Sequence, residues 1–149
     1  MLILSLELTQ ELGAHGIRTY PEEGCGLLLG KSEGERNLVS ALFPVENHWG
    51  VIEERRRRFR ITPADMMQAE MAAADRDLDI VGVFHSHPDC EPVASPRDLA
   101  WAAWSGYSYL ITEIRRGRVA GSRAWQLLPD RTGFIEEPVV IHETRNERI

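Results

Sequence analysis

The stretch Val81–Trp104, VGVFHSHPDCEPVASPRDLAWAAW, contains the pattern around which the rest of the chain is organised. It opens with an apolar run typical of a buried strand, and this run ends in two histidines one residue apart, His85 and His87. A proline-containing loop follows and leads to a helix start with Ser95 as cap, proline at the first helical position and Asp98 in the first turn. A strand, two histidines and a helix start in this order predict a metal site.

The spacing of these residues would allow them to share one ion. His85 and His87 project from the same face of the strand, because side chains two residues apart in a strand point the same way. Asp98 lies where the helix dipole favours an anion. Two histidines and one carboxylate suit zinc and leave the fourth tetrahedral position for water, as in a catalytic site. These residues alone leave a second interpretation open, since Ser95 and Asp98 are also what an ordinary capped helix needs.

Composition and length restrict the class of protein. A chain of 149 residues is one domain by size and can bury a sizeable core without disulfides or metal. No apolar run approaches the roughly 20 residues that a membrane span needs, and the apolar start lacks the features of a signal peptide, so we expect a cytoplasmic protein without a membrane partner. The net charge of −6 argues against nucleic acid as the main partner. We expect one domain over residues 1–142 and a polar tail over residues 143–149.

Apolar periodicity and turn residues predict alternating strands and helices. Strands are expected over residues 1–8, 24–31, 37–45, 79–87, 107–114, 119–128 and 134–142, with a short strand containing Phe59 and Ile61. The second and third of these strands should pair as a hairpin. Helices are expected from an N-cap at Thr9 to Pro21, over residues 62–78 with Thr62 as N-cap, and from Ser95 to about residue 105. In the middle helix a stripe that includes Met67 and Met71 is expected to face the core.

Two motifs together carry a resemblance to a known family. The region from His85 to Asp98 fits HxHx7SxxD in full, and EGCGLLLG lies upstream at Glu23–Gly30. Over nearly its whole length the sequence resembles the JAMM (MPN-plus) metalloprotease family, in its small stand-alone prokaryotic form. The resemblance implies an α/β fold, a central mixed β-sheet flanked by helices, of the cytidine deaminase-like JAMM/MPN domain.

The same resemblance implies roles for individual residues. One catalytic zinc ion would be bound by His85, His87 and Asp98, and Ser95 would donate a hydrogen bond to the tetrahedral intermediate. Glu23 would be the acid/base that activates the attacking water. Its neighbour Glu22 matches less well, because the family motif places its glutamate three residues before the glycine that is Gly26 here.

The implied activity is hydrolysis of a peptide or isopeptide bond at the C-terminus of a ubiquitin-like protein, in the small prokaryotic relatives a sulfur carrier. The tail of that protein could add as a strand beside the sheet edge, and the segment Asn47–Arg60 would contact the carrier body. A non-catalytic MPN-type scaffold or protein-interaction module is the alternative, but it has no use for three convergent ligands plus Glu23. A nucleic-acid module that uses the run Arg55–Arg58 is disfavoured by the net charge, and a solvated strand edge explains the run better. The oligomeric state is not predicted.

Two cysteines and two tryptophans have simpler interpretations beside functional ones. Cys90 could be a fourth metal ligand, although a free thiol is the expected state. A disulfide between Cys25 and Cys90 across the site is a further hypothesis, because Cys25 should share a strand face with Glu23. Trp101 and Trp104 are expected to be core or interface aromatics.

Overall fold

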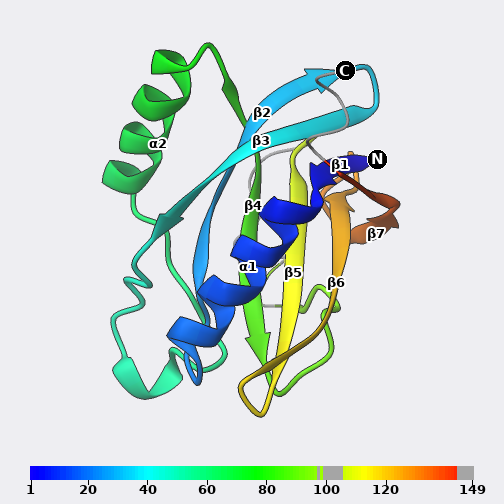
Figure 1. The fold of residues 1–149 in the computed structure, drawn as a ribbon. Helices are drawn as coiled ribbons and strands as arrows, with labels where there is room; N and C mark the ends of the chain where they lie inside the picture. Colours follow the sequence, from blue (N-terminus) through cyan, green and yellow to red (C-terminus); the bar gives the residue numbers. More distant parts are fainter. Residues whose placement is uncertain (97, 99–105, 144–149) are drawn as a thin grey trace.

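The computed structural model describes residues 1–96, 98 and 106–143, and within them a mixed sheet carries two helices (Figure 1). The helices are α1 (Leu6–Thr19) and α2 (Pro63–Asp75), and a 3₁₀ turn, η1, covers Ile52–Glu54. The strands are β1 (Leu2–Ser5), β2 (Cys25–Glu33), β3 (Arg36–Val45), β4 (Asp79–Pro88), β5 (Ser108–Arg115), β6 (Arg118–Leu127), β7 (Phe134–Glu137) and β8 (Val139–His142). Their order in the sheet is β7-β6-β5-β4-β2-β3-β1-β8. The expected architecture, a mixed sheet flanked by helices, is confirmed.

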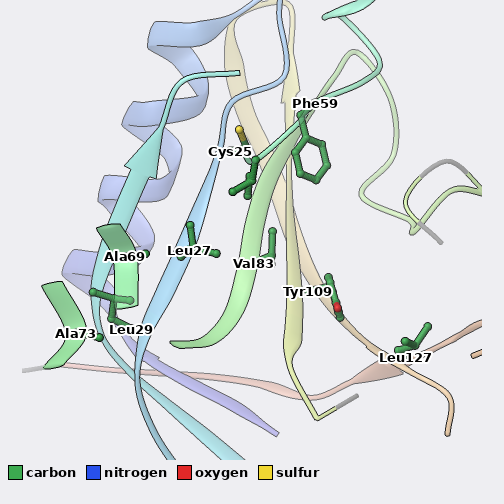
Figure 2. Packing of buried hydrophobic residues seen from close by; sticks show 10 residues of the cluster. Cys25, Leu27, Leu29, Phe59, Ala69, Ala73, Val83, Tyr109 and Leu127 are labelled. Atoms are coloured by element: carbon green, nitrogen blue, oxygen red, sulfur yellow. The ribbon is translucent and has the colours of Figure 1, made fainter. Parts of the chain in front are cut away.

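Helices α1 and α2 cover opposite faces of the sheet. Leu28 of β2 packs in one buried cluster with Leu8 of α1. The adjacent Leu27 packs in a second cluster with Ala69 of α2 (Figure 2). Since successive residues of a strand point to opposite faces, β2 is buried on both sides, which accounts for its continuous apolar run.

The sheet closes on itself where the chain passes from β7 to β8. The single strand predicted over residues 134–142 is wrong, because Pro138 divides it and its two halves lie at opposite edges of the sheet. A proline has no backbone N–H for a strand ladder, so pairing stops there. The N–H of Leu2 donates to the Pro138 carbonyl at 2.9 Å, and the Met1 ammonium lies 3.0 Å from the Glu137 carboxylate. Both edges of the curled sheet therefore meet at this proline.

Helix α1 begins four residues earlier than predicted. Ser5 is its N-cap and accepts the N–H of Leu8 at 3.1 Å, so the expected cap at Thr9 is wrong and the first strand ends at Ser5. Glycine at position 16 allows the helix to pack closely on the sheet, because a Cβ there would lie 2.8 Å from the Ile114 side chain of β5.

Helix α2 starts as predicted but turns a different face to the core. Its capping box at Thr62 is confirmed. Met67 and Met71, however, are 62% and 63% exposed, whereas Ala69 and Ala73 are 0% and 2% exposed. The expected methionine stripe is therefore wrong, because the helix lies against the sheet through its small side chains.

The remaining expectations divide between confirmed strands and regions outside the described residues. The strands expected over residues 24–31, 37–45, 79–87, 107–114 and 119–128 are confirmed, and β2 and β3 pair antiparallel as the predicted hairpin. Phe59 and Ile61 are buried but belong to no strand. Most of the helix expected after Ser95, both tryptophans in it and residues 144–149 lie outside the described part. In the described part, neither helix has the length and apolar content to cross a membrane.

Candidate metal and catalytic site

The end of β4 carries two buried histidines with their rings directed to one point. The Nε2 atoms of His85 and His87 lie 3.1 Å apart. The Asp98 carboxylate reaches both rings, with Oδ1 at 3.2 Å from His85 Nε2 and Oδ2 at 3.4 Å from His87 Nε2. The three ligand atoms lie within 4.8 Å of one another, so one metal ion could contact all of them. The structure thus brings together the three residues that the sequence singled out as ligands.

Hydrogen bonds and burial leave these groups in the forms that bind a metal. His87 Nδ1 lies 2.8 Å from the Glu91 carbonyl, which can only accept, so Nδ1 carries the proton and Nε2 offers its lone pair to the site. Burial lowers the pKa of His85 more than the neighbouring Asp98 raises it. Burial acts to raise the pKa of Asp98, but its contacts with His85 and His87 and the hydrogen bond from the Ser95 N–H outweigh burial and hold this pKa low. Two imidazole nitrogens and an ionised carboxylate are a suitable donor set for a divalent ion.

Ser95 orients Asp98 through a reciprocal pair of hydrogen bonds. The Ser95 Oγ accepts the Asp98 N–H at 3.1 Å, and the Ser95 N–H donates to Asp98 Oδ2 at 2.7 Å. A hydroxyl that accepts in this way still has its own proton to donate. Ser95 can therefore cap the chain at Asp98 and donate to a bound substrate at the same time.

Glu23 lies on the wall of a small cavity at the same place. This cavity of about 100 Å³ is lined by Glu23, His87, Ser95 and four further residues, Arg56, Arg57, Pro88 and Cys90. Glu23 is buried, whereas Glu22 is partly exposed and does not line this cavity. Of the two glutamates, the structure places Glu23 beside the histidines.

Ser86, the residue between the two histidines, fixes the start of β2 to β4. Its Oγ accepts the Gly24 N–H at 2.8 Å, and its own N–H donates to the Gly24 carbonyl at 3.0 Å. Glu23 directly precedes this joint. Sequence reasoning missed Ser86, and the signal that was available is a buried serine between two histidines in a central strand.

Asn47 joins the irregular segment after β3 to the site. Its Nδ2 donates to the carbonyls of Glu23 at 3.0 Å and Arg58 at 2.9 Å. Its Oδ1 accepts the N–H groups of Trp49 at 3.0 Å and Arg60 at 3.3 Å. These backbone groups are held by a side chain and not by a neighbouring strand, which explains why the short strand expected here does not form.

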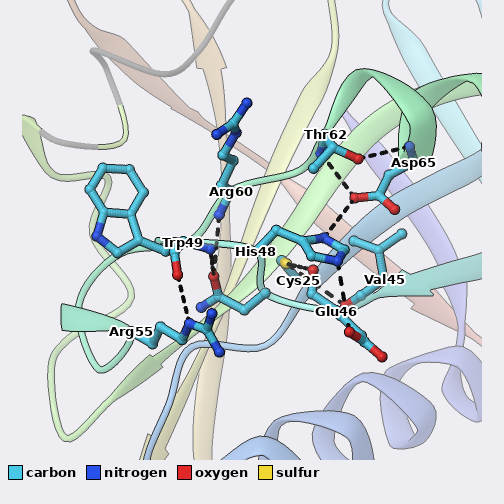
Figure 3. Close-up of polar contacts among 10 residues, drawn as sticks. Cys25, Val45, Glu46, His48, Trp49, Arg55, Arg60, Thr62 and Asp65 are labelled. Atoms are coloured by element: carbon cyan, nitrogen blue, oxygen red, sulfur yellow. Dashed lines mark hydrogen bonds and ion pairs between the residues drawn. The ribbon is translucent and has the colours of Figure 1, made fainter. Parts of the chain in front are cut away.

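Further contacts order the same segment over the histidines. Phe59 is buried and stacks on the His85 ring, with centroids 4.5 Å apart and planes inclined by 27°. His48 Nδ1 lies 3.2 Å from Asp65 Oδ2 at the start of α2 (Figure 3). The segment is thereby tied to the metal-ligand strand at one point and to α2 at another.

Neither proposed special role of the cysteines is supported. The hypothesis of a Cys25–Cys90 disulfide is wrong, because both thiols are free. Cys25 is buried, with its Sγ 3.9 Å from the carbonyls of Val45 and Glu46 (Figure 3). Cys90 is exposed at the cavity and is not part of the cluster whose ligand atoms lie within 4.8 Å of one another.

Comparison with known proteins gives matches over most of the chain. Residues 5–128 match the family model described as prokaryotic homologs of the JAB domain. A desampylase of Haloferax volcanii is 38% identical over 91 residues, which are 61% of this chain and 62% of the relative. A CysO-cysteine peptidase of Mycobacterium tuberculosis is 24% identical over 143 residues, 96% of this chain and 92% of the relative. The chain thus aligns with less than two thirds of the desampylase's length.

Solved structures have the same arrangement of elements. A solution structure of a Desulfitobacterium hafniense protein matches with a TM-score of 0.80 and 25% identity, over 96% of this chain and 94% of that one. A crystal structure of a JAB1/MPN domain protein from Archaeoglobus fulgidus matches with a TM-score of 0.58 and 18% identity, over 96% of this chain and 100% of that one. At that identity the second match concerns the fold alone.

Proposed function

The chain belongs to the family of prokaryotic homologs of the JAB domain, as expected from its JAMM-type motifs, and we propose that it is a zinc-dependent peptidase or isopeptidase. Its substrate is the C-terminus of a ubiquitin-like protein of the sulfur-carrier kind. The names of two relatives, a desampylase and a CysO-cysteine peptidase, support this substrate class. The observation that carries the proposal is the meeting of His85, His87 and Asp98 in one cluster, with Glu23 on the wall of the adjoining cavity.

In this proposal each residue has one task. His85, His87 and Asp98 hold a single zinc ion, which when bound acts as a Lewis acid and lowers the pKa of water to about 7. Glu23 takes the proton of the attacking water and delivers it to the leaving nitrogen. The Ser95 hydroxyl donates to the oxyanion that develops on the substrate carbonyl, where loss of one donor typically costs about 3 kcal/mol of the barrier.

A non-catalytic scaffold of the same fold is the alternative. It accounts for the sheet and helices but gives no reason for a buried glutamate beside a cluster of two histidines and an aspartate. We therefore favour the enzyme, and we propose that it acts in the cytoplasm as a single domain of residues 1–142, without a nucleic-acid or membrane partner. Segment 47–60, which borders the cavity, is proposed to contact the carrier body.

The variant Glu23→Gln tests the proposal, with Glu22→Gln as its matched control. The first variant is expected to keep one zinc per chain in metal analysis, because Glu23 is not among the proposed ligands. Its turnover of a ubiquitin-like carrier extended at the C-terminus should fall by about 10²–10⁴, the usual contribution of a general acid/base. Glu22→Gln removes the same charge one residue away and should stay active. A wild-type protein that binds no zinc, or a fully active Glu23→Gln protein, contradicts the assignment.

A further inference from the structure

The loop Asp89–Ala94, which joins His87 to Ser95, has only one buried residue, Pro92. Its other side chains are exposed or half-buried, so apolar packing holds the loop at a single point. The loop nevertheless supplies the Glu91 carbonyl, which lies 2.8 Å from His87 Nδ1. The conformation of a largely exposed loop therefore decides how one proposed metal ligand is oriented.

Two consecutive carbonyls of this loop have different partners. The Glu91 carbonyl faces His87, and it also accepts the Val93 N–H at 2.8 Å, which closes a three-residue turn across Pro92. The Pro92 carbonyl accepts the indole N–H of Trp125 at 3.0 Å. The proline ring fixes φ between the two carbonyls, and the turn restricts the ψ angle that remains. A bond to the Pro92 carbonyl thus orients the Glu91 carbonyl as well.

Trp125 is well suited to hold the loop, because its own ring is fixed on both sides. It is half-buried on β6 and packs against the buried cluster that includes Tyr109 of β5. The Arg123 guanidinium lies over the indole, 5.0 Å from the ring centroid. That guanidinium donates in turn to both oxygens of the Glu136 carboxylate, at 2.8 and 2.6 Å. The indole N–H therefore starts from a fixed position.

A simpler interpretation is that Trp125 only completes the edge of the core. A partly buried indole N–H usually finds some acceptor, so a hydrogen bond by itself would indicate nothing further. Here, however, the acceptor is the carbonyl next to the one that faces His87. The bond reaches a proposed metal ligand through one rigid turn, and this is the observation that gives Trp125 a second role.

We propose that Trp125 is a positioning residue for the metal site. Its indole N–H holds the Glu91–Val93 turn in place, and the Glu91 carbonyl then keeps the His87 ring turned with Nε2 toward the other two ligands. The inference rests on the proposed function and adds to it a residue of another strand that acts through the loop. Removing a partner that orients a metal-binding imidazole typically weakens metal binding roughly 10–100-fold. Trp125 acts one step further out, so we expect the lower end of this range.

The variant Trp125→Phe tests the inference, because it keeps an aromatic ring under Arg123 and removes only the indole N–H donor. Metal-free protein is titrated with zinc in competition with a chelator of known affinity, well below the unfolding temperature. The zinc dissociation constant of the variant should be about tenfold above that of the wild type. A role in the core alone would lower the unfolding temperature and leave the zinc affinity as it is.

Trp49→Phe is the matched control. The Trp49 indole N–H donates to the Glu54 carboxylate at 3.0 Å, and the Arg58 guanidinium lies 4.9 Å from its ring centroid. The control therefore loses the same kind of donor beside the same kind of cation, but in segment 47–60 and not at the loop. Its zinc dissociation constant should stay within about twofold of the wild type.

A spectrum and a second variant extend the test. Cobalt(II) bound in place of zinc has absorption bands that depend on the number and geometry of its ligands. These bands should change in Trp125→Phe and stay as in the wild type in Trp49→Phe. Arg123→Gln leaves the indole in place but removes the cation over it. The side chain is half-exposed, so this variant should fold, and it should weaken zinc binding about two- to fivefold.

The outcomes separate the inference from the proposed function. If the wild type binds zinc and Trp125→Phe binds it equally well with an unchanged cobalt spectrum, the inference is overturned and the proposed function stands. An equal loss of affinity in Trp49→Phe also overturns the inference. Should Trp125→Phe fail to fold, Arg123→Gln decides, and an unchanged zinc affinity there counts against the role of Trp125. A wild type that binds no zinc overturns the proposed function itself.

Discussion

Replacing Asn47 by alanine removes the side chain that joins the segment after β3 to the backbone of Glu23, just before the start of β2. Asn47 makes two hydrogen bonds as a donor, to the carbonyls of Glu23 and Arg58, and two as an acceptor, from the N–H groups of Trp49 and Arg60. Three of the four are 2.9–3.0 Å long, and the fourth, at 3.3 Å, is weaker. Their loss frees the segment from the Glu23 backbone without touching a proposed metal ligand.

The size of the effect follows from these contacts. A hydrogen bond contributes a net stability of about 1 kcal/mol, and part of it is recovered here because Asn47 is only half-buried and water can reach the freed groups. We therefore expect Asn47→Ala to lose roughly 2–3 kcal/mol of unfolding free energy. For a chain of this length each kcal/mol lowers the Tm by about 2–4 °C, so the Tm should fall by roughly 4–12 °C.

Thermal unfolding, trypsin cleavage and zinc analysis together check this expectation. Trypsin cuts after arginine, so a released segment should be cleaved faster at the run Arg55–Arg58. Zinc content should stay at one per chain, while turnover should fall because Glu23 is less well positioned. Asn47→Asp keeps the acceptor for Trp49 and Arg60 and should lie between alanine and the wild type. A Tm within 1 °C of the wild type, with unchanged trypsin cleavage, would refute the reasoning.

Two further predictions concern Ser95 and the cysteines. Ser95→Ala loses the cap on the Asp98 N–H, worth about 1 kcal/mol of stability, and the proposed oxyanion donor, so kcat should fall by about 10²–10³. If kcat falls no more than the loss of stability accounts for, Ser95 acts only as a helix cap. Burial, and then the charges of Glu23 and Asp65, raise the pKa of the Cys25 thiol. Because the thiolate is the reactive form, iodoacetamide should label only Cys90 in the native protein and both cysteines after denaturation, whereas two native labels at equal rates would contradict the buried placement.

The proposed ligands could be predicted because their geometry is local. His85 and His87 share a face through the two-residue period of a strand, and that strand was recognisable as an apolar run. Asp98 is placed by its own capping contacts with Ser95, three residues away. Neither relationship depends on how distant parts of the chain pack.

The features that the sequence did not predict depend on distant contacts. Helix α2 has apolar residues at helical spacing on two faces, and only the close approach of the sheet selects Ala69 and Ala73 over Met67 and Met71. The segment after β3 shows no periodicity at all. Its order comes from Asn47, whose partner Glu23 is 24 residues away in sequence.

The position of Glu23 follows from the register of two strands, and the histidine motif itself helps to set that register. Cys25 of β2 pairs with His85 of β4, and Gly24 is still hydrogen-bonded to Ser86. Continued by one more residue, this register brings Glu23 to His87, with which it lines the cavity. Since the period of a strand is two, a slip of one residue would turn Glu23 to the other face of the sheet. The two hydrogen bonds between Ser86 and Gly24 oppose that slip. The residue between the histidines is therefore not a spacer: it fixes the proposed acid/base opposite the second proposed ligand, which two histidines alone could not do.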